Sequence, residues 1–236
     1  MRRLLIALGR RVKGDTVFSI DEDVSGRALG GLILRRALMA ARGLVLAARS
    51  GSLVYPVFVG RGVVVTSPRF LKLSRGVTIE DFCRLDCLGK HGIALGAGVT
   101  LRRGVHIEVT SVLRDLGEGC VIDQGAGVSE GAYIGAKGFV HIGAETLIGP
   151  GCKIIAEEHV YSDPSATIRS QGVRRQGINI GADCWLGTNA VVLDGCHVGD
   201  GAVLAAGAVL TKDLAPMAIA AGVPARVVKS RANDAE

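Results

Sequence analysis

The sequence predicts an all-β solenoid, a parallel β-helix of stacked coils, on the strength of two observations. An aliphatic residue recurs at every sixth position across residues 180–215, and a fixed repeat of this kind is the sequence signature of a solenoid. Aromatic residues make up only 4% of the 236 residues, whereas there are 34 glycines. Such a composition suits thin coils with tight corners better than the thick core of a β-sandwich.

The six-residue repeat is clearest towards the C-terminus. Each hexad starts with an aliphatic residue and has a small residue four positions later. The aliphatic positions are Ile180, Leu186, Val192, Val198, Leu204 and Leu210, and the small positions are Cys184, Ala190, Cys196, Ala202 and Ala208. We expect three short strands per coil, with the aliphatic side chain inside and the small residue where the chain turns.

The same period continues upstream in three runs that differ in register. The runs are Leu95, Leu101 and Ile107; then Leu116, Ile122, Val128, Ile134 and Val140; then Ile142, Ile148 and Ile154. Neither a 3.6-residue nor a 2-residue period explains these spacings, which disfavours helices and hairpins here. The shifts predict short insertions at corners of a solenoid that spans residues 61–215 and is followed by a tail, 216–236.

The N-terminal segment, residues 1–60, has a different composition. Residues 1–50 hold ten Lys and Arg against four Asp and Glu, and the other 186 residues hold eighteen of each. Apolar residues dominate 27–49, which predicts a helix with Arg35, Arg42 and Arg49 on one side. Two roles fit this helix and are compatible with each other. It either caps the open end of the solenoid or lies on an anionic membrane surface.

Charge and hydropathy disfavour several classes of protein. The longest apolar region, 28–48, is interrupted by arginines, and the apolar stretch 4–8 is too short for a signal peptide. We therefore expect a cytoplasmic protein that is at most peripheral at the inner membrane surface. The basic excess is confined to the first 50 residues and no nucleic-acid-binding motif accompanies it, so no nucleic-acid partner is expected.

Six cysteines raise the question of a metal or redox site. Most of them occupy the small position of a hexad: Cys120, Cys152, Cys184 and Cys196, and also Cys83 if a hexad starts at Ile79. Cysteine at such a position is best interpreted as a small buried hydrophobe. The pair Cys83-x3-Cys87 has no second pair to complete a zinc site, so no metal is expected.

The repeat stops after Ile154 and resumes at Ile180, which makes residues 155–179 a polar excursion from the solenoid. Insertions in repeat proteins often build the binding face. His159 lies near the start of the excursion, and a neutral imidazole can take a proton from a hydroxyl group. On chemistry alone, an ordinary surface histidine is the commoner explanation.

The [LIV]-G-x4 repeat resembles that of the hexapeptide-repeat acyltransferases over roughly residues 75–215. This resemblance, and not the spacing, implies a left-handed β-helix. The run from Ile142-Gly143 through 148–150 (IGP) to His159 resembles the galactoside and maltose O-acetyltransferases, where a catalytic histidine follows at the same spacing. Those enzymes place an acetyl-contacting asparagine thirty residues earlier, and that position is Ser129 here.

The rest of the excursion is similar to the polysaccharide and lipopolysaccharide O-acetyltransferases. The similar segments are Asp163-Pro164, Gln171-Gly172 and 184–187 (CWLG). Both resemblances imply that His159 is the general base. Arg169, Arg174 and Arg175 would suit a phosphorylated or acidic sugar, although solvated loop charges are the commoner explanation.

The C-terminal region resembles the CoA-binding signature of the same enzymes, in segments 205–213 (AAGAVLTKD) and 222–226 (GVPAR). The resemblance implies acetyl-CoA contacts from Thr188, Ala206, Thr211, Lys212, Arg226 and Lys229. A groove of Gly and Ala suits the slim pantetheine arm, and cations suit its phosphates. Ala206 is also an ordinary repeat residue. Trp185 either caps its coil or, as we expect from its place beside the excursion, forms a wall of the thioester tunnel.

Together these features predict an acetyl-CoA-dependent O-acetyltransferase that acts on a sugar or glycan hydroxyl in surface-polysaccharide biosynthesis. His159 would deprotonate the acceptor, which attacks the thioester directly. The resemblance also implies a homotrimer with active sites between neighbouring chains.

Two other functions stay open: an N-acetyltransferase of an amino-sugar nucleotide and a non-catalytic scaffold. No glycine-rich nucleotide-binding motif precedes residue 60, which disfavours the first. The CoA signature and His159 disfavour the second. A γ-type carbonic anhydrase is disfavoured because no two histidines lie five residues apart.

Overall fold

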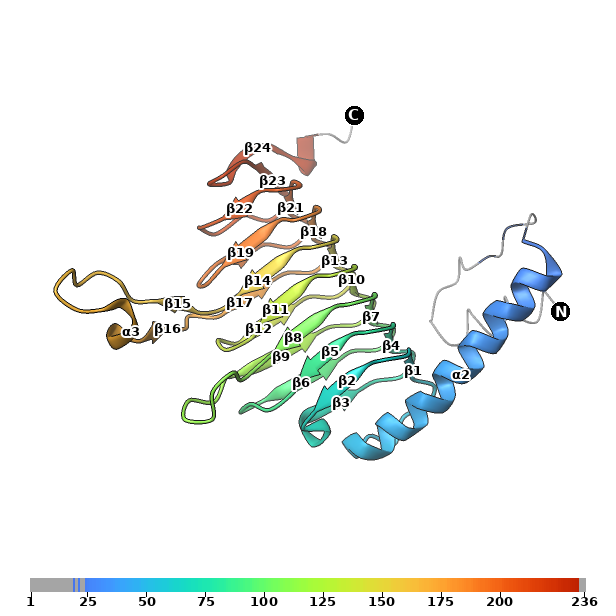
Figure 1. Cartoon of the computed structure of the whole chain (residues 1–236). Coiled ribbons are helices and arrows are strands. Elements are labelled where there is room, and N and C mark those ends of the chain that lie inside the picture. Colours follow the sequence, from blue (N-terminus) through green and yellow to red (C-terminus); the bar gives the residue numbers. More distant parts are fainter. Residues whose placement is uncertain (1–18, 20, 22–23, 234–236) are drawn as a thin grey trace.

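The chain forms a left-handed parallel β-helix in the computed structural model, as predicted, with α2 beside its N-terminal end (Figure 1). The structure describes residues 19, 21 and 24–233. Residues 1–18, 20, 22 and 23, which include the apolar stretch 4–8, lie outside the described residues. Strands from three sheets follow one another along the chain, and each pairs in parallel with strands one coil away.

The three sheets are named here A, B and C. Sheet A contains β1 (Phe58–Val59), β4 (Thr78–Ile79), β7 (Thr100–Leu101), β10 (Gly127–Val128), β13 (Leu147–Ile148), β18 (Trp185–Leu186), β21 (Val203–Leu204), β23 (Ala218–Ala221) and β24 (Arg226–Ser230). Sheet B contains β2 (Val64–Thr66), β5 (Arg84–Asp86), β8 (His106–Glu108), β11 (Tyr133–Gly135), β14 (Lys153–Ile155), β19 (Val191–Leu193) and β22 (Val209–Leu210). Sheet C contains β3 (Leu71–Leu73), β6 (Gly92–Leu95), β9 (Gly119–Ile122), β12 (Val140–Ile142), β17 (Ile178–Ile180) and β20 (His197–Val198). The short helices η1 (Pro68–Phe70) and η2 (Arg231–Asn233) precede β3 and follow β24.

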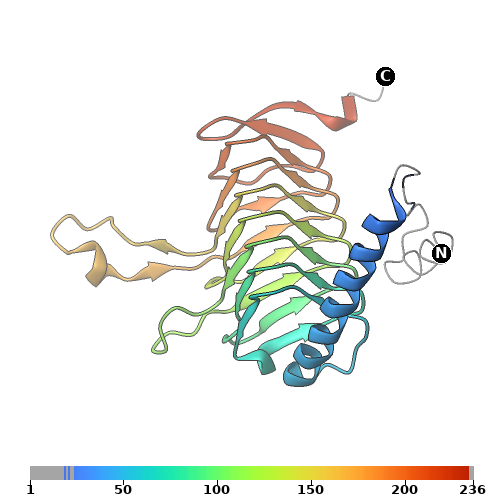
Figure 2. The same ribbon diagram turned by 45° about the vertical axis from the view of Figure 1, so that its right-hand side comes forward.

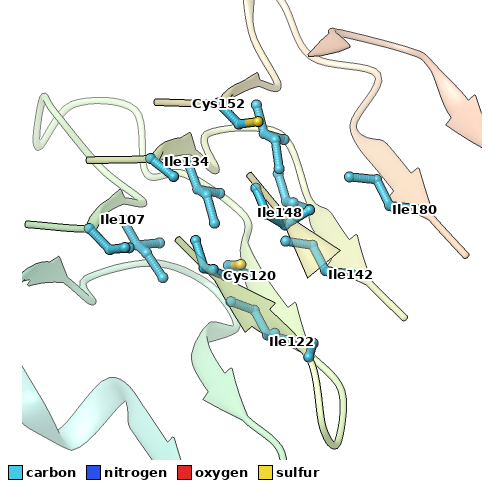
Figure 3. Packing of buried hydrophobic residues seen from close by; sticks show 14 of the residues in the cluster. Ile107, Cys120, Ile122, Ile134, Ile142, Ile148, Cys152 and Ile180 are labelled. Carbon is cyan, nitrogen blue, oxygen red and sulfur yellow. The ribbon is translucent and has the colours of Figure 1, made fainter. Parts of the chain in front are cut away.

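Inward-facing side chains of successive coils stack into one continuous core (Figure 3). The six aliphatic positions predicted from Ile180 to Leu210 are at most 3% exposed, and so are the five small positions between them. Each coil therefore buries its inner face on the next one, which is why a chain with few aromatic residues can still build a core.

The strands of sheet C explain the shifts in register. The strands of this sheet before β20 carry two inward residues each, such as Val140 and Ile142 in β12, both fully buried, because alternate side chains of a strand share a face. Two of the predicted positions are wrong. Leu116 is 37% exposed and lies in the loop 109–118, and Cys120 lies inside β9 and not at a corner. Extending the six-residue period back from Ile122 fails because this loop interrupts it.

The boundaries of the solenoid differ by a few residues from those that the sequence suggests. The first coil begins at β1, inside segment 1–60, and the excursion occupies 156–177, because Ile155 and Ile178 already pair within sheets B and C. In the tail 216–236, β23 continues sheet A in parallel, and β24 folds back on it antiparallel.

Helix α2 (Gly26–Ser50) packs on the first coil of the solenoid (Figures 1 and 2). The Ser25 side chain caps it by accepting a hydrogen bond from the Ala28 amide. The face formed by Met39, Ala40, Gly43 and Leu46 is buried, and Leu46 belongs to the core of the solenoid. The capping role predicted for this helix is thus seen in its packing. None of the helices that the structure describes is long and apolar enough to cross a membrane.

Candidate active site

The excursion is a hairpin that projects from the side of the solenoid (Figure 1). Its strands β15 (Glu158–His159) and β16 (Val173–Arg174) pair antiparallel, and α3 (Ile168–Gln171) lies near its tip. His159 is exposed, and its ring forms no hydrogen bond with any other residue that the structure describes. The hairpin therefore presents an exposed imidazole that has no hydrogen-bond partner among the described residues.

A small ionic network fixes the base of the hairpin. Arg175 binds Glu157 and Asp115, each at 2.8 Å, and Lys137 binds Glu157 at 3.0 Å. The side chains of Arg175 and Glu157 are only 17% and 15% exposed, so they are less screened than ordinary surface pairs. The network joins the hairpin to the loop 109–118 and to the coil below it, which gives His159 a rigid base.

These pairs bear on the three arginines that the sequence suggests for an acidic acceptor. Arg174 pairs with Glu158 across the hairpin, and Arg175 is held by Glu157 and Asp115. Arg169 alone of the three is exposed without an ion pair in the described part of the chain. Two of these arginines therefore brace the hairpin.

The tip of the hairpin is ordered by its own side chains but leaves apolar groups outside. The Gln171 amide accepts a hydrogen bond from the Asp163 amide and donates one to the Asp163 carbonyl, both at 3.0 Å. Tyr161 and Ile168 are 67% and 55% exposed.

The predicted CoA residues fall into groups at different edges of the solenoid. Thr188 and Ala206 lie on successive coils at the edge between sheets A and B, where the Thr188 carbonyl accepts a hydrogen bond from the Gly207 amide at 2.9 Å. Trp185 lies on the same coil in sheet A, 55% exposed, and pairs in register with Leu147. It points outward and does not fill its own coil, so the coil-capping alternative is wrong.

The other candidate CoA residues lie nearer the C-terminal end of the solenoid. Thr211 and Lys212 are exposed at the edge between sheets B and C, where the neighbouring Asp213 carboxylate accepts a hydrogen bond from the His197 amide at 2.8 Å. Arg226 and Lys229 are exposed on β24. The excursion leaves the solenoid at this same B–C edge, whereas Thr188 and Ala206 lie at the A–B edge. Within one chain, the width of sheet B therefore lies between His159, the candidate base, and the candidate CoA residues Thr188 and Ala206.

Sequence reasoning missed a row of polar side chains on the outer face of sheet C. The His141 ring bonds to Asp123 at 2.9 Å and to Asn179 at 2.7 Å, and Asn179 bonds to His197 at 2.9 Å. A signal was available for part of this row: three hexads make one coil, so residues 18 apart are stacked where no insertion intervenes, as Asn179 and His197 are.

The cysteines lie in apolar surroundings. All six are buried and free. Burial raises the pKa of Cys83 to about 11 and that of Cys87 and Cys120 to about 12. Burial raises the pKa of Cys152, Cys184 and Cys196 too. Thiols of this kind are poor nucleophiles. Among the residues that the structure describes, no cluster of three His, Cys, Asp or Glu could hold a metal ion.

The fold and the repeats resemble those of left-handed β-helix transferases with hexapeptide repeats. Residues 177–212 match the family described as bacterial transferase hexapeptide (six repeats). A probable acetyltransferase of Mycobacterium tuberculosis is 36% identical over 92 residues, which are 39% of this chain and 31% of that protein. A provisionally named acetyltransferase of Staphylococcus aureus is 42% identical over 67 residues, 28% of this chain and 34% of that protein. The matches thus span about a third of these relatives.

Solved structures share the fold over most of the chain. A hexapeptide-repeat-containing acetyltransferase of Vibrio cholerae, solved with acetyl-CoA, has a TM-score of 0.51 at 17% identity and covers 94% of this chain and 97% of its own. AntD, an N-acyltransferase of Bacillus cereus solved with dTDP and 3-hydroxybutyryl-CoA, has a TM-score of 0.53 at 16% identity and covers 80% and 88%. At these identities the likeness concerns the fold.

Proposed function

We propose that the protein is an acetyl-CoA-dependent O-acetyltransferase that acts on a hydroxyl of a sugar or glycan, with His159 as general base. The observation that carries the proposal is the braced hairpin, which presents His159 at the side of an otherwise regular solenoid, exposed and without a hydrogen-bond partner in the described part of the chain. A neutral imidazole in that position can accept the hydroxyl proton as the oxygen attacks the thioester carbon. The thiolate of CoA then leaves, and no covalent acyl-enzyme is needed.

The predicted CoA residues support acetyl-CoA as the donor. At the A–B edge, Thr188 and Ala206 offer backbone and small side chains to a pantetheine arm, and the exposed Trp185 precedes Thr188 by three residues in the same coil. The exposed Lys212 and Arg226 suit the phosphates of CoA. The relatives with acetyltransferase names are consistent with this donor.

We further propose a homotrimer whose active sites lie between chains. In one chain, sheet B separates the hairpin from the A–B edge, so His159 of one chain would meet the Trp185, Thr188 and Ala206 of its neighbour. The exposed Tyr161 and Ile168 at the tip of the hairpin, and the exposed pair Leu147 and Trp185 on sheet A, would be covered by such contacts. Exposed apolar patches commonly mark interfaces.

Helix α2 suggests peripheral contact with an anionic membrane. Its outward face, opposite Gly43, carries exposed apolar side chains, Leu34, Leu38 and Val45, which are 50–62% exposed. Arg35 and Arg42 lie beside this face, and among the described residues each has one weak polar contact, Arg35 with Asp81 at 3.6 Å and Arg42 with the Val59 carbonyl at 3.4 Å. An apolar stripe with cationic flanks is the pattern of interfacial helices.

The test is mass spectrometry of acceptors incubated with acetyl-CoA and the full chain, in which neutral sugars, amino sugars and nucleotide sugars are compared. We expect mass gains on hydroxyl acceptors, reduced roughly 10²–10⁴-fold in His159→Ala with CoA binding retained. Acetylation confined to amines would replace O-transfer by N-transfer to an amino sugar. Transfer to none of the acceptors would favour a scaffold.

A further inference from the structure

A hollow in the outer face of sheet C, near the N-terminal end, is not explained by the CoA site or by His159. Outward-facing residues of this sheet stack in register in the order Lys72, Ala94, Val121 and His141. Successive strands lie about 4.8 Å apart, so the two small residues leave a gap of two strands between the long side chains on either side. The resulting cavity measures about 380 Å³.

Aromatic rings form the side of this hollow that lies next to the B–C edge. Phe70, His91 and Phe139 each come directly before a strand of sheet C, so they stand in a row at the edge of the sheet. The rings of His91 and Phe139 meet edge to face, 5.8 Å apart. Phe70 and Phe139 remain 43% and 37% exposed. Flat apolar walls of this kind suit the C–H faces of a sugar ring.

The hollow is also positively charged. Arg69, Lys72 and Lys90 line it. Lys90 pairs with Glu118 at 2.7 Å, and His91 approaches the same carboxylate at 3.7 Å. Arg69 and Lys72 have no ion pair in the part of the chain that the structure describes, so three cations face one carboxylate. Unpaired cations in a concave surface attract anions more strongly than the same charges on a flat one.

The position of the hollow connects it to the proposed active site. The Phe139 carbonyl, on its wall, accepts a hydrogen bond from the Ile178 amide at 2.8 Å, directly after the hairpin that carries His159. Gly138, next to Phe139, donates to the Ala156 carbonyl at 2.7 Å, directly before the hairpin. The hollow and the hairpin therefore share the B–C edge.

We infer that this hollow, which we call the sheet C pocket, binds the anionic group of a sugar acceptor, a phosphate or a carboxylate, between Arg69 and Lys72, with the sugar ring against Phe70 and Phe139. This inference rests on the proposed function for the role of acceptor, since the anion is held at the edge from which the hairpin projects. The binding of an anionic sugar is argued from the residues of the pocket alone.

The test is calorimetric titration of the full chain, without acetyl-CoA, with glucose 1-phosphate, glucuronate, inorganic phosphate and glucose. We expect the two anionic sugars to bind, phosphate to bind more weakly because it lacks a ring, and glucose not to bind. In Arg69→Gln/Lys72→Gln the affinity for the anionic sugars should fall roughly tenfold or more, since two charge-assisted contacts are lost. The control Arg61→Gln/Lys153→Gln removes the same charges from exposed positions in other parts of the solenoid and should bind like the wild type.

Equal affinity in the pocket variant and the control, or equal binding of glucose and glucose 1-phosphate, would overturn the inference. Stronger binding of glucose 1-phosphate than of glucuronate would identify phosphate as the anion, and the reverse would identify a carboxylate. Binding that needs the pocket but without acetyl transfer to the bound sugars would count against the proposed function and leave the pocket standing. Acetyl transfer with an unchanged KM for the acceptor in the pocket variant would support the proposed function and count against the sheet C pocket as the acceptor site.

Discussion

The contact between α2 and the first coil allows a stability prediction with opposite signs at two glycines of one helix. A Cβ added at Gly43 would lie 1.8 Å from the Val57 carbonyl oxygen, which is backbone and cannot rotate away. A Cβ at Gly31 would meet nothing within 4 Å. Alanine is worth about 1 kcal/mol over glycine in a helix, whereas overpacking costs about 1–3 kcal/mol. Because a contact of 1.8 Å with backbone belongs in the upper half of that range, Gly43→Ala should lose about 1–2 kcal/mol net, and Gly31→Ala should gain up to about 1 kcal/mol.

Thermal unfolding of the full chain by circular dichroism measures the difference. At about 2–4 °C per kcal/mol for a chain of this size, Tm should fall by about 2–8 °C in Gly43→Ala and rise by up to about 4 °C in Gly31→Ala. Trypsin should also cut Gly43→Ala faster at Arg42 and Arg49, because the helix would release from the coil. If Gly43→Ala melted at or above the wild-type temperature, the close packing of α2 on the solenoid would be refuted.

Three further predictions concern the thiols, the assembly and the membrane. Burial raises the pKa of Cys83 to about 11 and that of Cys120 to about 12, so the native thiols should not react with a disulfide reagent at pH 8 and should react only on unfolding, and rapid labelling of the native protein would contradict their burial. Because the thiols of the unfolded chain lose their protons first, the free energy of unfolding should fall as the pH rises above about 9. Sedimentation at micromolar concentration should give three times 24.5 kDa, and a fully active monomer would contradict the shared site. The chain should co-sediment with phosphatidylserine vesicles at low salt and be released at high salt. Less of the protein should bind in the variants Arg35→Gln/Arg42→Gln/Arg49→Gln and Leu34→Gln/Leu38→Gln, and absence of binding at low salt would leave α2 with its capping role alone.

Much of the fold could be predicted because the coil repeats. A residue such as Leu186 sits in the same environment as Val192 one strand later, so periodicity alone identifies the inside, and both are fully buried. Periodicity gives a wrong inward position where an insertion interrupts the six-residue period, as at Leu116. It also could not place Cys120, because a strand of sheet C has two inward positions and a six-residue template allows one.

Less of the site could be predicted, because its geometry depends on which edge of the solenoid a residue occupies. The sequence and its resemblance suggested His159 and Thr188 together, but the position of each within its coil puts them at different edges. The sheet C pocket depends on the small size of Ala94 and Val121 in stacked positions, which no motif records. Arg175 was suggested as a ligand for an acidic sugar, and the carboxylates that hold it, Glu157 and Asp115, are far apart in sequence.

The most direct test of the central claim is complementation between two inactive variants of the full chain. His159→Ala removes the base, and Ala206→Tyr fills the exposed position at the A–B edge where the pantetheine arm is proposed to lie. When the two are unfolded and refolded together in equal amounts, random trimers with sites shared between chains contain about one quarter of intact sites. We predict acetyl transfer at about a quarter of the wild-type rate from the mixture, against near-background rates from each variant alone. A mixture as inactive as its parts, with trimers of normal mass, would contradict the account.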